Sequence, residues 1–97
     1  MVFGAAAAAI TFWPEMPSGP VDVAVHTTIS RSGFRFSRRR IPPELTFRDH
    51  QVLLTTPALT ALDLIRTHGG DPIDRVLRSR QTTHQMIWQA FTMTPSP

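Results

Sequence analysis

The segment FRFSRRRI, residues 34–41, carries the densest group of side chains that could do chemistry. It begins with the alternating apolar and polar residues of a half-buried strand and then reaches Arg38, Arg39 and Arg40. Continued alternation would place Arg38 and Arg40 on the side of Phe36, and a core face cannot hold two unpaired guanidiniums. The strand must therefore leave the core by residue 38. Its arginines could then meet phosphate, a protein partner or water.

Asp63 is a carboxylate in an otherwise apolar helical segment. Only Thr60 and Thr67 join it in a narrow polar stripe at helical spacing. Because an unpaired buried charge costs on the order of several kcal/mol, we predict an arginine partner for Asp63, either from the triplet 38–40 or Arg66. A role as acid, base or metal ligand has less support, since no second acid or histidine stands at a suitable spacing.

A second basic segment follows near the C-terminus. Arg75 and Arg78 each stand four positions after an acid, Asp71 and Asp74, which favours surface ion pairs along one helix. The alternative is a basic patch that adds Arg80. Combined with the strand arginines, such a patch would give a general nucleic-acid-binding module one basic face. Its members would be Arg35, Arg38, Arg39, Arg40, Arg75, Arg78 and Arg80.

The sequence offers no constellation for catalysis. Cysteine and lysine are absent, which excludes thiolate nucleophiles, Cys-ligated zinc and the usual carboxylate–lysine centre of nucleases. The histidines stand at positions 26, 50, 68 and 84, much farther apart than compact metal-ligand sets. We therefore expect no enzymatic activity, no cofactor, no metal and no small-molecule substrate.

Length and composition predict one small globular domain over residues 1–92, followed by a disordered tail over 93–97. The chain has 97 residues, of which 41% are hydrophobic and 18% charged, and its net charge of +3 raises the expectation of a nucleic-acid partner only slightly. No run approaches the roughly 20 apolar residues that cross a bilayer. The alanine-rich start lacks the basic residues of a signal peptide, so we expect a cytoplasmic protein.

An α+β fold is the predicted architecture, with a small sheet made of two antiparallel hairpins. Val21, Val23 and Val25 alternate on one face of the first strand. A buried helix is expected before this strand and a proline-rich connector between them. The expected segments are a helix over 5–12, a connector over 14–20, a long-looped hairpin of strands 21–25 and 34–37, and a tighter hairpin around residues 48–51.

Three C-terminal helices are expected to pack on one face of this sheet. The first begins with Thr56 as N-cap and Pro57 at its first position, and ends at 69–70, two glycines. The second begins with Asp71 as its cap, followed by Pro72. The third spans residues 83–92. We expect its Ile87, Trp88 and Phe91 to face the core, and His84, Gln85, Gln89 and Thr92 to face outward.

The segment TTPALTALDL, residues 55–64, carries a family resemblance. Together with AAAAAITFW, the proline-rich spacer, VDVAV, the arginine-bearing strand and DPIDRVLRSR, it resembles the C-terminal portion of the AbiEi-like antitoxins of bacteria. The resemblance covers about residues 2–91. The positions that agree with the family's strand-to-helix signature are Thr56, Pro57, Thr60, Leu62, Asp63 and Leu64.

This resemblance implies an antitoxin of a type IV toxin–antitoxin system. In that family an N-terminal winged helix binds operator DNA and represses transcription, while the C-terminal part antagonises a nucleotidyltransferase-like toxin without a stable complex. No winged-helix segment precedes Ala5, so operator binding is not carried over to this chain. Leu59 stands where an arginine is common, which predicts the loss of one basic contact. The chain ends before the nuclease-like domain of some long relatives, so no hydrolytic residues are expected.

Overall fold

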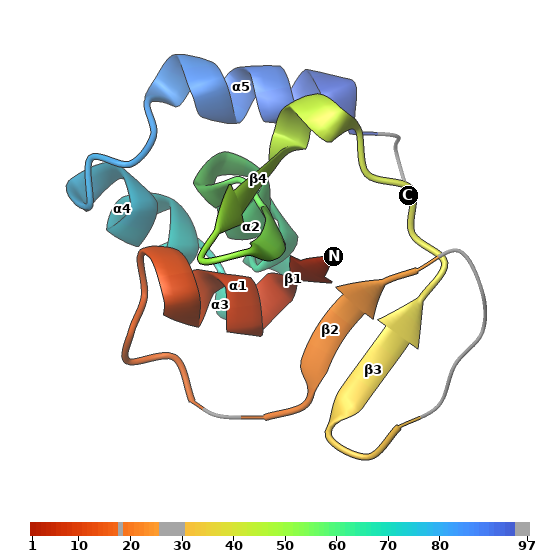
Figure 1. Cartoon of the computed structure of the whole chain (residues 1–97). Helices are drawn as coiled ribbons and strands as arrows, with labels where there is room; N and C mark the ends of the chain where they lie inside the picture. The colour runs from red at the N-terminus through yellow and green to blue at the C-terminus, as the bar shows by residue number, and fades with distance from the viewer. Residues whose placement is uncertain (18, 26–30, 95–97) are drawn as a thin grey trace.

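The computed structural model describes residues 1–17, 19–25 and 31–94 and confirms an α+β fold (Figure 1). Its strands are β1 (Val2–Phe3), β2 (Val21–Ala24), β3 (Phe34–Ser37), β4 (Thr46–Asp49) and β5 (Val52–Thr55). Its helices are α1 (Gly4–Thr11), α2 (Pro57–Asp63), α3 (Ile65–His68), α4 (Asp71–Arg78) and α5 (His84–Met93), with a 3-10 helix η1 (Pro43–Leu45). Met93, which was expected in the C-terminal tail, belongs to α5, and residues 95–97 lie outside the described ranges.

The strands form one mixed sheet in the order β3-β2-β1-β5-β4. The two residues of β1 lie at its centre, antiparallel to β2 and parallel to β5. No strand was expected there, because two residues are too few to show alternation. A short central strand therefore lies between the two strand pairs that were expected to form the sheet by themselves, and the sheet is mixed.

The predicted hairpin of β2 and β3 is wrong, since these strands are parallel. Val21 is paired with Phe34 and Ala24 with Ser37, and the amide of Val21 donates to the carbonyl of Gly33 at 2.9 Å. A parallel neighbour requires the chain to return along the length of β2. The connection from residue 25 to 33 is long enough for that, because four strand residues span only about 13 Å. Residues 26–30 of this connection, including His26, lie outside the described ranges.

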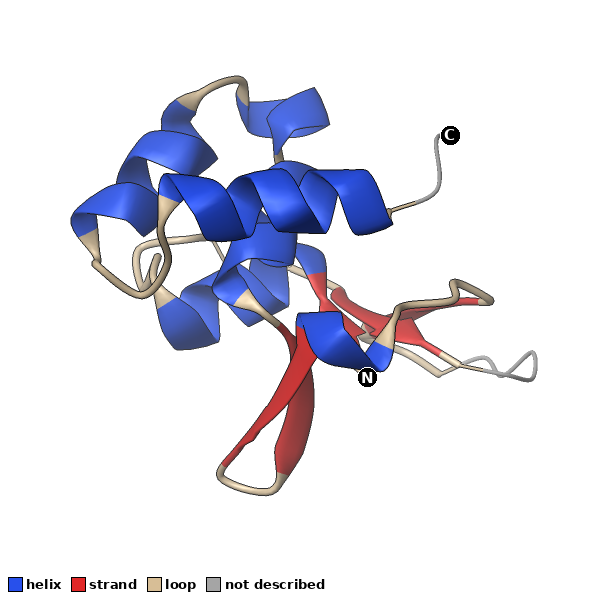
Figure 2. Cartoon of the chain, turned by 90° about the horizontal axis from the view of Figure 1, so that it is seen from above, coloured by secondary structure: helices blue, strands red, loops and turns tan. Residues whose placement is uncertain are grey.

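The second predicted hairpin is confirmed. β4 and β5 are antiparallel, with Thr46 opposite Thr55 and Asp49 opposite Val52. His50 and Gln51 form the two-residue loop and both adopt positive φ angles, 49° and 68°. The hairpin projects away from the helices (Figure 2).

The C-terminal helices are arranged around α2 and do not form a layer on one sheet face, as had been expected. α2 contacts α1, α4 and α5, and Figure 1 shows it between these three helices. The helix expected to run without a break to Gly69 is divided at Leu64 into α2 and α3. Four C-terminal helices therefore replace the expected three, and none of the described helices is long and apolar enough to cross a membrane.

The caps of these helices follow the sequence with one exception. The Thr56 hydroxyl accepts a hydrogen bond from the Leu59 amide at 3.4 Å, and Pro57 opens α2 as predicted. Thr83 caps α5 in the same way, because its hydroxyl accepts a hydrogen bond from the Met86 amide at 3.2 Å. In α4, however, Asp71 is the first helical residue and Gly70 is the cap, so the boundary lies one residue earlier than expected.

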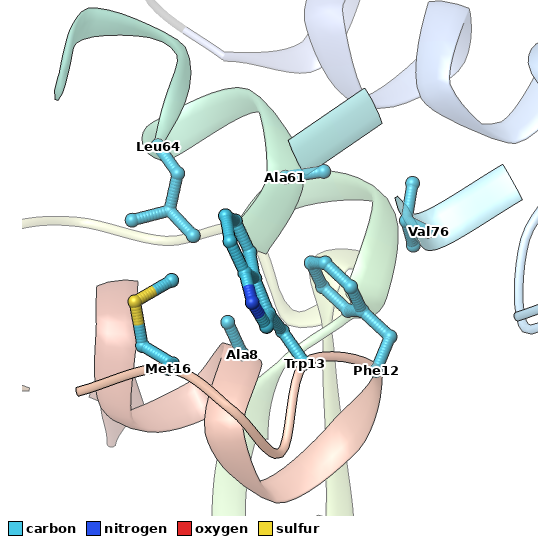
Figure 3. Close-up of a cluster of buried hydrophobic side chains, with 7 residues drawn as sticks. All are labelled: Ala8, Phe12, Trp13, Met16, Ala61, Leu64 and Val76. Carbon is cyan, nitrogen blue, oxygen red and sulfur yellow. The ribbon is translucent and has the colours of Figure 1, made fainter. Parts of the chain in front are cut away.

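Two clusters of buried side chains lie on different sides of α2. Figure 3 shows the first cluster, in which α1, the connector after it, α2 and α4 meet. Its members are Ala8, Phe12, Trp13, Met16, Ala61, Leu64 and Val76. The second consists of Leu45, Ala58, Leu59 and Ala90 and joins η1, α2 and α5. The proline-rich connector, predicted only as irregular, thus contributes Met16 to the core.

Candidate functional site

Arg39 lies just beyond the end of β3 and is fixed by two other elements. Its Nη1 and Nη2 atoms donate to Asp63 Oδ2 and Oδ1 of α2 at 2.6 and 2.8 Å. The guanidinium also lies over the ring of Phe3 in β1, 5.0 Å from the ring centroid. Both side chains of the ion pair are mostly buried, with 24% and 17% exposed. The predicted arginine partner of Asp63 is therefore confirmed, and this arginine connects three parts of the fold.

The signature residues around Asp63 also include contacts that hold elements of the fold together. Thr60 is fully buried, and its hydroxyl lies 2.7 Å from the Thr55 hydroxyl and 2.8 Å from the Thr56 carbonyl oxygen. These contacts fix the start of α2 against the end of β5. Leu59, where the resemblance would place an arginine, is 1% exposed and fills the second core cluster. Thr60 therefore acts in the interior, whereas Leu62, another signature residue, is partly buried and lines a pocket beside α5.

Two further arginines of the predicted set have acidic partners. Arg35 of β3 contacts Asp22, its paired residue on β2, at 2.9 Å. Arg75 of α4 lies 4.3 Å from the centroid of the Trp13 ring and 3.9 Å from Glu15. Within the described ranges no ion pair joins Arg75 to Asp71 or Arg78 to Asp74. The predicted pairs along α4 are thus absent, because Arg75 turns toward the connector after α1.

The structure does not bring the seven predicted arginines together on one face. Figures 1 and 2 both place β3 and the segment after it on the opposite side of the molecule from α4. The reason is that β3 is the outer strand of the sheet, whereas α4 packs on α2 and α3. Arg38 and Arg40 on one side, and Arg78 and Arg80 on the other, are exposed. The basic residues form two small separate groups.

The outer face of α5 is the largest exposed aromatic feature among the described residues. Trp88 is 66% and Phe91 59% exposed, and their rings stack at 5.7 Å with an interplanar angle of 22°. A pocket of about 250 Å³ adjoins this pair and is lined by Leu62, His84, Ile87, Trp88 and Phe91. Apart from the titratable His84, α5 carries no ionisable side chain. This face therefore combines exposed rings with a hollow, and α5 carries no acidic residue and no arginine.

Trp88 and Phe91 were expected to face the core, and that expectation is wrong. α5 packs through Ile87 and through Ala90, which is completely buried against the second cluster. Trp88 and Phe91 each follow one of these residues in sequence, so they point about 100° away around the helix. Ala90 was the signal that could have identified the buried face, because its small side chain allows close approach to α2. The outward positions of His84, Gln85, Gln89 and Thr92 are as predicted.

The described histidines lie in unrelated environments. His50 is in the β4–β5 turn, His68 packs edge-on against Trp13 at 5.5 Å, and His84 opens α5. In the part of the chain that the structure describes, no group of three or more metal-binding side chains is present.

Comparisons with models of protein families, with curated proteins and with solved structures find no match for this chain.

Proposed function

We propose that this chain is a non-catalytic regulatory module that binds another protein through the outer face of α5. The stacked, exposed rings of Trp88 and Phe91 carry the proposal. The centres of protein interfaces are enriched in Trp, Phe and Met and depleted in charge, which matches this helix. Residues that carry most of the binding energy of an interface are enriched in Trp, and Trp88 lines a pocket here.

The family resemblance gives the proposal a partner, a nucleotidyltransferase-like toxin that the module antagonises in the bacterial cytoplasm. The size of the surface agrees with the transient contact that the resemblance implies. Two rings and a pocket of about 250 Å³ form a small surface, and weak encounters bury less than about 1,200 Å². Antagonism without a stable complex requires no larger interface.

Co-expression with a nucleotidyltransferase-like toxin encoded beside this chain tests the proposal. The wild-type chain should restore growth, and a chain carrying Trp88→Ser and Phe91→Ser should not. Ile10→Ser provides a matched control, because Ile10 is an equally apolar, 51% exposed residue on α1. Unchanged rescue by the α5 double variant would refute the α5 surface, and failure of the wild-type chain to rescue would refute the antitoxin role.

A general nucleic-acid-binding module is the competing function and has less support. Arg35, Arg39 and Arg75 are engaged by acidic side chains, and the remaining arginines are split between two sides of the molecule. Duplex binding through phosphate contacts would weaken with salt, with a slope of about 0.9 per phosphate neutralised. We expect no binding of duplex DNA that follows such a slope.

A further inference from the structure

The parallel pairing of β2 and β3 places the carboxyl ends of both strands at the same edge of the sheet. Val25 follows β2 and donates its amide hydrogen to the carbonyl of Ser37, the last residue of β3, at 2.8 Å. The arginine triplet begins with the next residue. A pocket of about 460 Å³ lies at this edge. Its lining residues are Met1, Ala24, Val25, Arg39, Arg40, Ile41 and Pro43.

The ionisable side chains of this pocket are all basic. Arg39 and Arg40 line it, and no acidic residue does. Two of the five N–H groups of Arg39 donate hydrogen bonds to Asp63, and three N–H groups remain. Arg40 is exposed, and no ion pair of this residue is found in residues 1–17, 19–25 and 31–94. Arg40 therefore contributes positive charge to the pocket, whereas the charge of Arg39 is matched by Asp63 and only its remaining N–H donors are available to an anion.

The remaining walls are apolar. Ala24, Val25, Ile41 and Pro43 supply them. The volume lies within the roughly 300–1,000 Å³ of small-molecule sites, which combine apolar walls with a few directed polar groups. Arg39 is also held in one orientation by Asp63 and Phe3, so little entropy is lost when it binds.

We propose that this pocket binds a small organic anion. Its oxyanion, a carboxylate or a phosphate ester, contacts the guanidiniums of Arg40 and Arg39, which present the forked donors that such groups accept. Its apolar part lies against Ala24, Val25 and Ile41. This site is distinct from the outer face of α5, so it remains testable if the proposed toxin contact fails.

The test is a titration of the ¹⁵N-labelled chain with phenyl phosphate, benzoate and inorganic phosphate at constant ionic strength, followed by amide chemical shifts. We expect shifts at Val25, Arg40 and Ile41 and a Kd of about 1 mM for the better aromatic anion. Inorganic phosphate should bind about tenfold more weakly, because burial of roughly 60 Å² of ring surface gives about that gain. The ratio between phenyl phosphate and benzoate identifies the preferred oxyanion.

Arg40→Gln should weaken binding by at least about tenfold, since it removes a charge-assisted contact. Arg78→Gln removes the same charge from an exposed site on α4 and should change binding by less than about twofold. Equal losses in both variants, or no shifts at Val25 and Ile41 in the wild-type chain, would overturn the proposal. So would binding of a single-stranded oligonucleotide at these amides without binding of phenyl phosphate.

Discussion

The segment after β3 and the outer face of α5 reverse the usual pattern of burial. A charged side chain is mostly buried in the first, and aromatic side chains are exposed on the second. Arg39 is only 24% exposed, because Asp63 and the Phe3 ring surround its guanidinium. Trp88 is 66% exposed, although tryptophan carries a large apolar surface. The comparison shows that available partners decide burial here. The Arg39 guanidinium can be buried because Asp63 binds it through both carboxylate oxygens. The Trp88 ring stays exposed because α5 packs on α2 through the smaller Ala90.

The two tryptophans, Trp13 and Trp88, also differ in burial, although the residue type is the same. Trp13 is 8% exposed and packs in the first core cluster between α1 and α2. The Arg75 guanidinium and the His68 ring cover it from other directions. Trp88 has one ring partner, Phe91. Trp13 therefore contributes to folding, and Trp88 is available for binding.

The largest expected effect separates these tryptophans. Trp13→Ala should lower the free energy of unfolding by about 3 to 5 kcal/mol, because it empties a buried site. Trp88→Ala should lower it by less than about 1 kcal/mol, because it removes only a surface stack. Urea denaturation of both variants measures the difference. Equal losses would mean that α5 packs through Trp88, as the sequence pattern suggested.

Removal of the acid from the enclosed ion pair should have the next largest effect. Asp63→Ala leaves the mostly buried Arg39 without its partner, and we expect a loss of about 2 to 3 kcal/mol and a fall in Tm of about 10 to 20 °C. Asp74→Ala is a suitable control, because Asp74 is exposed on α4, and it should change stability by less than about 0.5 kcal/mol. A Tm within about 1 °C of wild type for Asp63→Ala would refute the structural role.

The sequence predicts those features that a few neighbouring residues determine. Thr56 and Pro57 mark the start of α2, and the β4–β5 hairpin follows from alternation around a polar turn. An arginine partner of Asp63 could also be predicted, because a carboxylate in an apolar helix requires a cation. Of the expected candidates, the triplet 38–40 and Arg66, the structure shows Arg39.

Features that depend on distant packing could not be predicted in this way. The parallel pairing of β2 and β3 and the central place of the two-residue β1 depend on contacts between segments that are distant in the sequence. The rotation of α5 depends on how closely Ala90 approaches α2. The pocket beside Arg40 lies where the parallel strands β2 and β3 end at the same edge, so an antiparallel hairpin could not have predicted it. Local patterns carry no information on such contacts.

The β4–β5 turn places two residues other than glycine in a backbone conformation that favours glycine. His50 and Gln51 both have positive φ, a conformation that costs roughly 1 to 2 kcal/mol for residues other than glycine. The variant His50→Asn with Gln51→Gly supplies the preferred pair for this turn and should raise stability by about 1 kcal/mol, or Tm by about 4 to 8 °C. Thermal denaturation measures this. A lower Tm would show that the 2.8 Å contact between His50 and Asp49 outweighs the strain.

The smallest expected effect concerns the second arginine pair of the sheet. Arg35 contacts Asp22 at 2.9 Å, compared with 2.6 Å between Arg39 and Asp63, and the Arg35 side chain is 65% exposed. Arg35→Ala should therefore cost only about 0.5 kcal/mol, and the cost should vanish at about 1 M salt, where the screening length is about 3 Å. The cost of Asp63→Ala should persist at that salt concentration, because screening is weak for a mostly buried pair. If salt reduced the cost of Arg35→Ala and the cost of Asp63→Ala equally, Arg39 would be exposed to solvent. The contrast between a buried arginine after β3 and an exposed tryptophan on α5 would then disappear.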